Sequence, residues 1–356
     1  MKIALLNTIK PGPGSGDGIT EYTYQISQRL KKGNTVDLVY PLEESKRNDI
    51  FGLVYANSVF KLRIRNLAKE GYDVIHITNQ ELGFAAKMLK RLGTRAKIIT
   101  SIHDLMRVKD LEGYHKGLLQ DAYNNMVASS IHDAVDFSDH IIFTASTVNN
   151  DAEKRFPQMK KHVTTLLCPK DQFRTVKIPN SKKGGTFKVG YIGALAFRKN
   201  VIFILKTAKR LKDKAPNVKF LIYGSGAEKE NLIAYKEKND LTNVTFMGFA
   251  QEKTLMQTYD SFDLFFFPTM EEGSSLPILD AQARGLPALV LKENNLDEEV
   301  TRCCMKTTGE ADAAKAILNL SRNGYNSKER EKSTKYARSF SWDRVAKETF
   351  AVYKKA

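Results

Sequence analysis

The chain has 356 residues, enough for two domains with separate hydrophobic cores. A composition of 42% hydrophobic and 27% charged residues is that of a globular protein, and no run of eighteen apolar residues offers a membrane-spanning helix. The net charge of +16 favours anionic partners: nucleotides, polyprenyl phosphates or an anionic membrane surface. Because the positive charge is spread over both halves without a dense block, we predict no nucleic-acid partner.

The first half alternates short apolar runs with longer amphipathic segments, the pattern of a doubly wound parallel sheet. Tyr22, Ile26 and Leu30, for example, recur at helical spacing. We predict strands at 3–6, 36–40, 74–77, 98–102, 141–144 and 163–167.

The segment 11–18, after the first strand, is rich in glycine and proline. Glycines allow a backbone to approach a ligand closely. The segment does not match the dinucleotide-binding pattern, because no Gly-x-Gly in it is followed three residues later by Gly or Ala. From its own residues it is a flexible loop.

Histidines lie near the ends of two of the predicted strands. His76 is followed by Ile77 and Thr78, which places it inside the strand as a packed side chain. His103 lies at the carboxyl end of its strand, just before Asp104, where ligands bind in open α/β sheets.

The segment 53–69 mixes apolar and basic residues at helical spacing. We expect its apolar stripe to pack on the sheet and its charges to face water. Binding of this basic amphipathic helix to an anionic membrane is kept as the minority alternative.

Residues 177–186, with Pro179, Asn180 and paired glycines, are predicted to link two domains. We therefore expect an N-terminal acceptor-side domain at 1–176, a C-terminal donor domain at 187–338 and a final helix at 339–356. The βα alternation restarts after the linker, and a cleft between two such domains is a usual ligand site. The predicted strands of the second half are 187–192, 220–223, 244–247, 264–267 and 288–291.

Two cations, Arg198 and Lys199, follow the first strand of the second half. A helix start disfavours positive charge, so a bound anion such as a diphosphate is expected there. The glycine turn 224–226 also fails the dinucleotide pattern, because Lys229 stands where Gly or Ala is required.

The most informative stretch is 264–280, a buried aromatic strand followed by two glutamates, a Gly-Ser-Ser turn and a helix start. Ser275 is a candidate N-cap and Pro277 is tolerated in the first turn. The free N–H groups of a helix N-terminus bind phosphate. Since Glu272 and Asp280 flank this anion site, and carboxylates accept hydrogen bonds from hydroxyls, the stretch indicates a ligand with phosphates and hydroxyl-rich groups, such as a nucleotide sugar.

This stretch resembles the signature of retaining glycosyltransferases of family 4, which have the GT-B architecture. That family has two glutamates separated by seven residues around a glycine-rich turn and a Leu-Pro. Here Glu272 is the first acid, Asp280 replaces the second glutamate, and Ala194 stands where the family often has an arginine. The resemblance spans nearly the whole chain.

The resemblance implies two Rossmann-like domains with doubly wound parallel sheets facing a cleft, and a C-terminal helix that returns to the N-terminal domain. It implies diphosphate contacts from Lys199, sugar contacts from Glu272 and His103, and nucleobase contacts through the backbone near Gly248. The implied catalytic residues are His103, Lys199 and Glu272, and the implied donor-binding residues are Gly16, Gly18, Arg198, Gly248, Phe249, Gly273, Ser274, Ser275, Leu276 and Asp280.

The predicted function is retaining transfer of a sugar from a nucleotide-diphosphate sugar to a glycan or lipid-linked acceptor. A UDP-sugar is the favoured donor and GDP-mannose the next. No Asp-x-Asp appears in the sequence, so we expect no metal and no cofactor besides the nucleotide sugar. The three cysteines, Cys168, Cys303 and Cys304, lack metal-ligand spacing and favour a reducing cytoplasm, with the inner face of the membrane as a peripheral site.

Two other functions stay open. One is a nucleotide-sugar epimerase or phosphorylase-like enzyme with the same fold. The other is a non-catalytic basic protein that binds a membrane or nucleic acid. An NAD-dependent oxidoreductase is disfavoured by the two failed glycine patterns.

Overall fold

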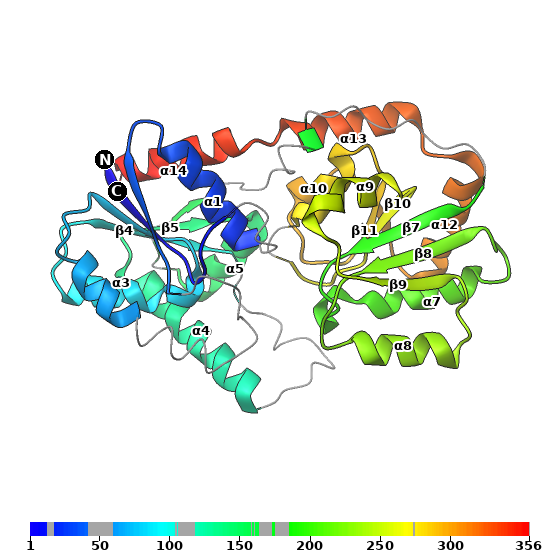
Figure 1. The fold of residues 1–356 in the computed structure, drawn as a ribbon, viewed down its shortest axis with the longest axis horizontal. Helices are drawn as coiled ribbons and strands as arrows, with labels where there is room; N and C mark the ends of the chain where they lie inside the picture. The colour runs from blue at the N-terminus through cyan, green and yellow to red at the C-terminus, as the bar shows by residue number, and fades with distance from the viewer. Residues whose placement is uncertain are drawn as a thin grey trace. The chain divides into compact units, whose positions relative to one another are not determined.

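The computed structural model describes residues 1–12, 18–41, 60–103, 105, 118–157, 159, 161–163, 173–174, 185–272 and 275–355. The chain divides into two compact units. One consists of Met1–Leu166 together with Trp342–Ala356, and the other of Leu167–Ser341. Each unit is built on a parallel sheet with flanking helices (Figure 1).

The sheet of the first unit has the strand order β2-β1-β3-β4-β5-β6, and every described pairing is parallel. Its strands begin or end within a few residues of the predicted apolar runs. They are β1 (Lys2–Leu6), β2 (Thr35–Val39), β3 (Val74–Ile77), β4 (Lys97–Ile102), β5 (His140–Phe143) and β6 (Lys161–Val163). The helical elements of this unit are α1 (Gly18–Leu30), η1 (Gln80–Leu82), α3 (Phe84–Arg91), α4 (Leu118–Phe137), α5 (Ser146–Arg155) and α14 (Trp342–Lys355).

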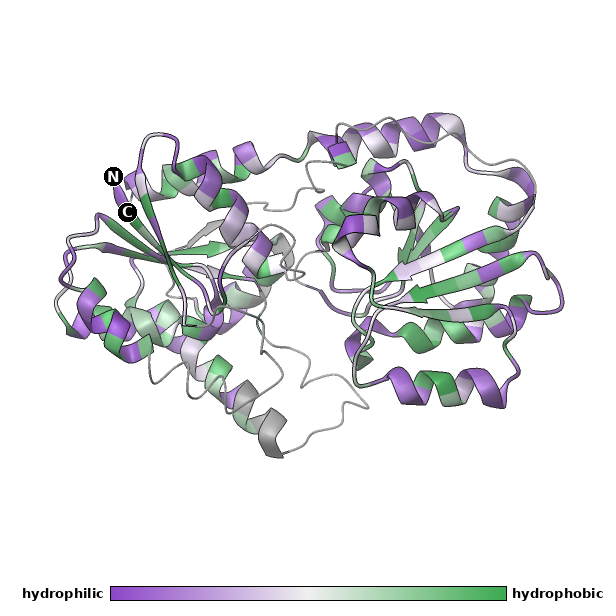
Figure 2. Ribbon diagram, viewed as in Figure 1, coloured by the Kyte–Doolittle hydropathy of each residue, from purple (hydrophilic) through white to green (hydrophobic). Residues whose placement is uncertain are grey.

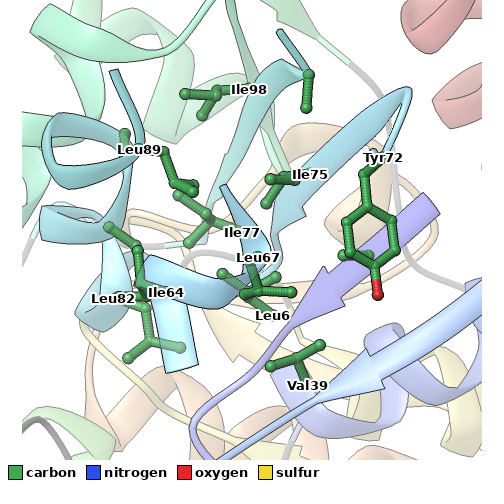
Figure 3. Close-up of a cluster of buried hydrophobic side chains, with 14 of the residues drawn as sticks. Leu6, Val39, Ile64, Leu67, Tyr72, Ile75, Ile77, Leu82, Leu89 and Ile98 are labelled. Atoms are coloured by element: carbon green, nitrogen blue, oxygen red, sulfur yellow. The ribbon is translucent and has the colours of Figure 1, made fainter. Parts of the chain in front are cut away.

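Part of the core of this unit lies between the sheet and the helical residues 60–67 (Figure 3). Ile64 and Leu67 are buried against Leu6 and Ile75, whereas the neighbouring Arg63 is exposed. The apolar stripe of the basic helix therefore packs on the sheet, as expected, and its residues 53–59 lie outside the described part.

The C-terminal helix α14 belongs to the first unit, which confirms the predicted return of the chain. Tyr353 forms a 2.6 Å hydrogen bond with Nδ1 of His76, and His76 is fully buried within β3. Near the start of the helix, Arg29 of α1 pairs with Asp343 at 2.7 Å. His76 is thus the packed strand histidine that the sequence predicted.

The second sheet has the order β12-β11-β10-β7-β8-β9, again with parallel neighbours. Counted within the unit this is the order 6-5-4-1-2-3 of a dinucleotide-binding fold, which reverses between β7 and β10. Its strands are β7 (Phe187–Ile192), β8 (Val218–Tyr223), β9 (Val244–Gly248), β10 (Leu264–Phe267), β11 (Ala288–Leu291) and β12 (Met305–Thr307). Its helical elements are η3 (Phe197–Lys199), α7 (Val201–Leu211), α8 (Lys229–Lys238), η4 (Glu252–Thr254), α9 (Leu255–Asp260), α10 (Leu276–Ala283), α11 (Glu298–Thr301), α12 (Glu310–Asn323) and α13 (Ser327–Ser339).

Many residues of the strands are hydrophobic, while α13 is largely hydrophilic (Figure 2). Phe173 is fully buried and packs edge-to-face on Tyr259 of α9, so this residue belongs to the second unit although it precedes the expected linker at 177–186. Most of that linker lies outside the described residues. Strand β12 was not predicted, because a three-residue strand with an exposed Lys306 carries no recognisable apolar run.

The glycine turn after β8 packs against the loop that follows β7. Gly224 has φ of +147°, and a Cβ atom placed there would lie 1.8 Å from the carbonyl oxygen of Gly193. Gly226 approaches the carbonyl oxygen of Leu195 in the same way. These glycines therefore permit contact between two loops of the protein itself.

No helix in the described residues is both long enough and apolar enough to cross a membrane.

Candidate functional site

The site lies where the strand order of the second sheet reverses. Strands β7 and β10 are neighbours, paired at Leu264 with Val189 and at Phe265 with Gly190. The loop after β7 leads to Arg198 and Lys199, and the loop after β10 leads to Glu272. Because the carboxyl ends of parallel strands share one edge, these residues meet although more than seventy positions separate them.

Glu272 holds both cations through one carboxylate oxygen. Its Oε2 accepts a hydrogen bond from Nη1 of Arg198 at 2.8 Å and another from Nζ of Lys199. The side chain of Lys199 is 9% exposed and that of Glu272 19% exposed. Arg198, Lys199 and Glu272 thus form a largely buried group with one negative and two positive charges.

Burial alone would raise the pKa of Glu272, but the nearby charges of Lys199 and Arg198 outweigh it and hold the pKa below its ordinary value. The carboxylate therefore stays ionised at neutral pH. Charge-assisted hydrogen bonds of this kind are stronger than neutral ones.

The backbone around Arg198 is fixed independently of the ion pairs. Its carbonyl oxygen accepts hydrogen bonds from the Met270 amide at 2.9 Å and from the Thr269 hydroxyl at 3.0 Å. Its Nη1 also donates to the carbonyl oxygen of Glu271 at 3.2 Å. Sequence reasoning missed Thr269 and Met270, because a search for charged side chains does not reveal residues that hold a backbone.

Aromatic residues of β7 and β10 pack beside Lys199. Its Nζ lies 5.1 Å from the centroid of the Phe267 ring, close enough for a cation–π interaction. Tyr191 stacks on Phe267 at 5.8 Å and donates a 2.8 Å hydrogen bond to the carbonyl oxygen of Ala194. At Ala194, the position that the family often fills with arginine, the chain thus offers a carbonyl group already bonded within the protein.

Helix α10 supplies the second part of the candidate site. Ser275 is at its N-cap position, Pro277 lies in its first turn, and Gly285 follows its end with φ of +75°, all as predicted. The Ser275 hydroxyl is buried, makes no capping bond and has no hydrogen-bond partner in the described structure. Asp280 lies about one turn into the helix and is 3% exposed.

Leu276 begins α10, and Gly273 and Ser274 lie outside the described residues. Gly248 and Phe249 are placed two strands away from β7, at the carboxyl end of β9. Gly248 accepts a 2.7 Å hydrogen bond from the Gly224 amide through its carbonyl oxygen, and Phe249 is 72% exposed.

The remaining predicted residues belong to the first unit. Gly18 begins α1, and Gly16 lies outside the described residues. Nε2 of His103 donates to the carbonyl oxygen of Thr78 at 2.9 Å, and the His103 amide donates to Oε1 of Gln80 at 3.1 Å. Thr78 and Gln80, which orient this histidine, were not predicted.

No group of three or more histidine, cysteine, aspartate or glutamate side chains suited to a metal ion occurs within the ranges that the structure describes.

Part of the chain is similar in sequence to known glycosyltransferases. The model of the family described as "Glycosyl transferases group 1" matches residues 172–340. An uncharacterized glycosyltransferase of Methanocaldococcus jannaschii is 28% identical over 176 residues, which cover 46% of this chain and 44% of that protein. The first curated relatives are matched over 44% to 60% of their own length.

Two solved structures show the same fold over nearly the whole chain. Sucrose-phosphate synthase from Thermosynechococcus elongatus has a TM-score of 0.74 at 17% identity and covers 99% of this chain and 98% of its own. HepE from Anabaena, solved with UDP and glucose, has a TM-score of 0.73 at 14% identity and covers 100% of both chains.

The chain therefore has the GT-B fold of these solved structures. Residues 172–340, which hold Arg198, Lys199, Glu272 and α10, are similar to the group 1 glycosyl transferases.

Proposed function

We propose that the protein transfers a sugar from a nucleotide-diphosphate sugar to a glycan or lipid-linked acceptor, with retention of anomeric configuration and without a metal ion. The observation that carries this proposal is the group formed by Arg198, Lys199 and Glu272. The group lies where the strand order of the second sheet reverses, within the residues that match the group 1 glycosyl transferase model. Two cations at the carboxyl ends of parallel strands suit a diphosphate, and a carboxylate beside them suits sugar hydroxyls.

Each residue has a proposed task. Arg198 and Lys199 stabilise the charge that develops on the departing diphosphate, together with the backbone N–H groups at the start of α10. Glu272 binds donor sugar hydroxyls and Asp280 the ribose hydroxyls.

The buried hydroxyl of Ser275 supports the phosphate role of the α10 N-terminus. A buried hydroxyl without a partner costs free energy, and a phosphate oxygen at this position would accept its hydrogen bond. In retaining transfer by front-face attack, a donor phosphate oxygen takes the acceptor's proton, so no general base is needed among the side chains.

A UDP-sugar is the favoured donor and GDP-mannose the next. HepE, which shares the fold, was solved with UDP and glucose. The net charge of +16 and the exposed basic residues of 60–67 suit binding to an anionic membrane surface that carries a lipid-linked acceptor. We propose that the protein is cytoplasmic and binds the inner face of the membrane.

A thermal-shift panel of UDP-, GDP- and ADP-sugars tests the proposal, with Lys199→Met beside Lys238→Met, a lysine exposed on α8. We expect one nucleotide class to stabilise the wild type and Lys238→Met but not Lys199→Met. Transfer must then require an added acceptor, because an epimerase would release nucleotide without one. Tight oligonucleotide binding at physiological salt, with no response to any nucleotide sugar, would instead favour the non-catalytic alternative.

A further inference from the structure

Arg198 and Lys199, which we propose bind the donor diphosphate, already have an anionic partner inside the protein. Oε2 of Glu272 accepts from both Arg198 and Lys199, the groups to which the proposed function assigns the donor diphosphate. Arginine and lysine carry only N–H donors, and carboxylate and phosphate oxygens compete for the same ones. A diphosphate therefore reaches these donors by displacing the Glu272 carboxylate.

Both cationic residues have contacts besides the carboxylate that joins them. Hydrogen bonds from Met270 and Thr269 fix the carbonyl of Arg198, and Lys199 stays over the Phe267 ring. These contacts do not involve the Glu272 side chain. Rotation of that side chain can therefore exchange one anion for the other while these contacts stay in place.

A displaced Glu272 carboxylate needs new hydrogen-bond donors, since a largely buried carboxylate without donors is unfavourable. The hydroxyls of a donor sugar supply them. A nucleoside diphosphate, the product of transfer, has no sugar beyond its second phosphate, so it displaces the carboxylate without offering it a partner and adds negative charge beside it. The two ligands therefore differ at Glu272 even though both occupy the cations.

Resting on the proposed function, we infer that Glu272 is a reversible counter-ion of Arg198 and Lys199 that makes the site prefer nucleotide sugar over nucleoside diphosphate. In the empty site it neutralises part of the cation pair, and with donor bound it turns to the sugar hydroxyls. After transfer it competes with the product diphosphate for the cations. This competition promotes product release.

The test is a comparison of dissociation constants for UDP, a UDP-sugar and inorganic pyrophosphate, measured by calorimetry on the full chain. Glu272→Gln removes the charge but keeps a side chain that can bond hydroxyls. Glu237→Gln, at an exposed position on α8, makes the same change in net charge away from the site. If another nucleotide class stabilises the protein in the thermal-shift panel, its diphosphate and sugar replace UDP and the UDP-sugar.

We expect Glu272→Gln to bind the nucleoside diphosphate and pyrophosphate about tenfold more tightly than the wild type, the size of a partly buried charge-assisted contact of about 1.4 kcal/mol. The preference for nucleotide sugar should shrink by a similar factor, and product inhibition should become stronger. Adding Lys199→Met to Glu272→Gln should cancel the gain. Glu237→Gln should behave as the wild type.

Weaker or unchanged diphosphate binding in a folded Glu272→Gln protein would overturn the inference and leave the proposed function standing. If the wild type binds neither pyrophosphate nor any nucleotide or nucleotide sugar, the proposed function fails, and the inference fails with it. Thermal unfolding of each variant confirms that the folded protein is being measured.

Discussion

Nη1 of Arg198 lies 2.8 Å from Oε2 of Glu272, an oxygen that also accepts from Lys199. The contact joins the two loops that leave β7 and β10 in opposite directions along the sheet. The contact thus connects the loops of two strands between which the strand order reverses, and it lies at the centre of the proposed donor site. Substitutions of Lys199 and Glu272 separate these two properties.

Replacing Lys199 by methionine should reduce sugar transfer by roughly a hundredfold or more, the usual effect of removing one group that stabilises developing charge. Methionine keeps most of the apolar stem over Phe267, so the fold should be retained. Initial rates with saturating donor and acceptor measure the effect, with Lys238→Met as the matched control. Full activity in Lys199→Met would remove Lys199 from the mechanism.

Glu272→Gln should lower the free energy of unfolding more than Lys199→Met does. The first change leaves two cations without their shared carboxylate, whereas the second leaves the pair of Arg198 and Glu272 intact. We expect Glu272→Gln to lower the free energy of unfolding by about 2 kcal/mol, which is between the losses for exposed and fully buried ion pairs. Lys199→Met should lower it by under about 1 kcal/mol. Urea unfolding monitored by circular dichroism provides the comparison. Equal losses would mean that the three charges are not coupled.

Gly224→Ala should destabilise the second unit strongly. The new methyl group would meet the carbonyl oxygen of Gly193, and φ at Gly224 is +147°. A loss of about 3 kcal/mol or more is expected from strain and overpacking together. Gly33→Ala is the control, because its φ of +104° is also unfavourable but no atom lies within 4 Å of the new methyl group. That variant should lose only about 1 kcal/mol. Similar losses in both variants would show that the loops can separate at little cost.

Acidification should weaken the first unit through His76. Burial, together with the charge of His103, lowers the pKa of His76 to about 3 in the folded protein from an ordinary value of 6.5. The unfolded chain therefore binds more protons between these values, so the free energy of unfolding falls as pH decreases from about 6.5 toward 3. The slope for a single group is about 1.4 kcal/mol per pH unit.

Chemical unfolding at pH 6.5 and pH 5.0 tests this prediction in the wild type and in His76→Gln. Glutamine can still hydrogen bond to Tyr353 and Ser101, the partners of the two ring nitrogens, but does not titrate. The variant should therefore lose about 2 kcal/mol less than the wild type between the two pH values. The same loss in both proteins would assign acid sensitivity to other groups.

Sugar transfer should be unaffected by a metal chelator, since Arg198 and Lys199 provide the positive charge that a metal would otherwise place on the diphosphate. Assays after extended dialysis against EDTA, with and without added Mg²⁺ or Mn²⁺, measure this directly. Strict dependence on an added metal would contradict the proposed mechanism.

Much of the fold could be predicted because local residues decide it. Apolar runs such as 74–77 and 264–267 are buried on both faces of a parallel sheet, so they stand out without any knowledge of their neighbours. Helix α10 carries its own start and stop signals in Pro277 and Gly285. Strand β12 carries none, since its three residues owe their conformation to pairing with β11.

In the candidate site too, some features follow from local sequence and others from the tertiary structure. Charges and glycines that follow buried strands predict a ligand-binding edge from local sequence alone. Arg198, Lys199, Glu272 and Asp280 are charged residues of this kind. The pairing of Glu272 with both cations depends instead on the strand order, because the strand order fixes which loops meet and no local pattern encodes it. The same is true of Gly224, whose role depends on the backbone of a loop that it meets only in the folded unit.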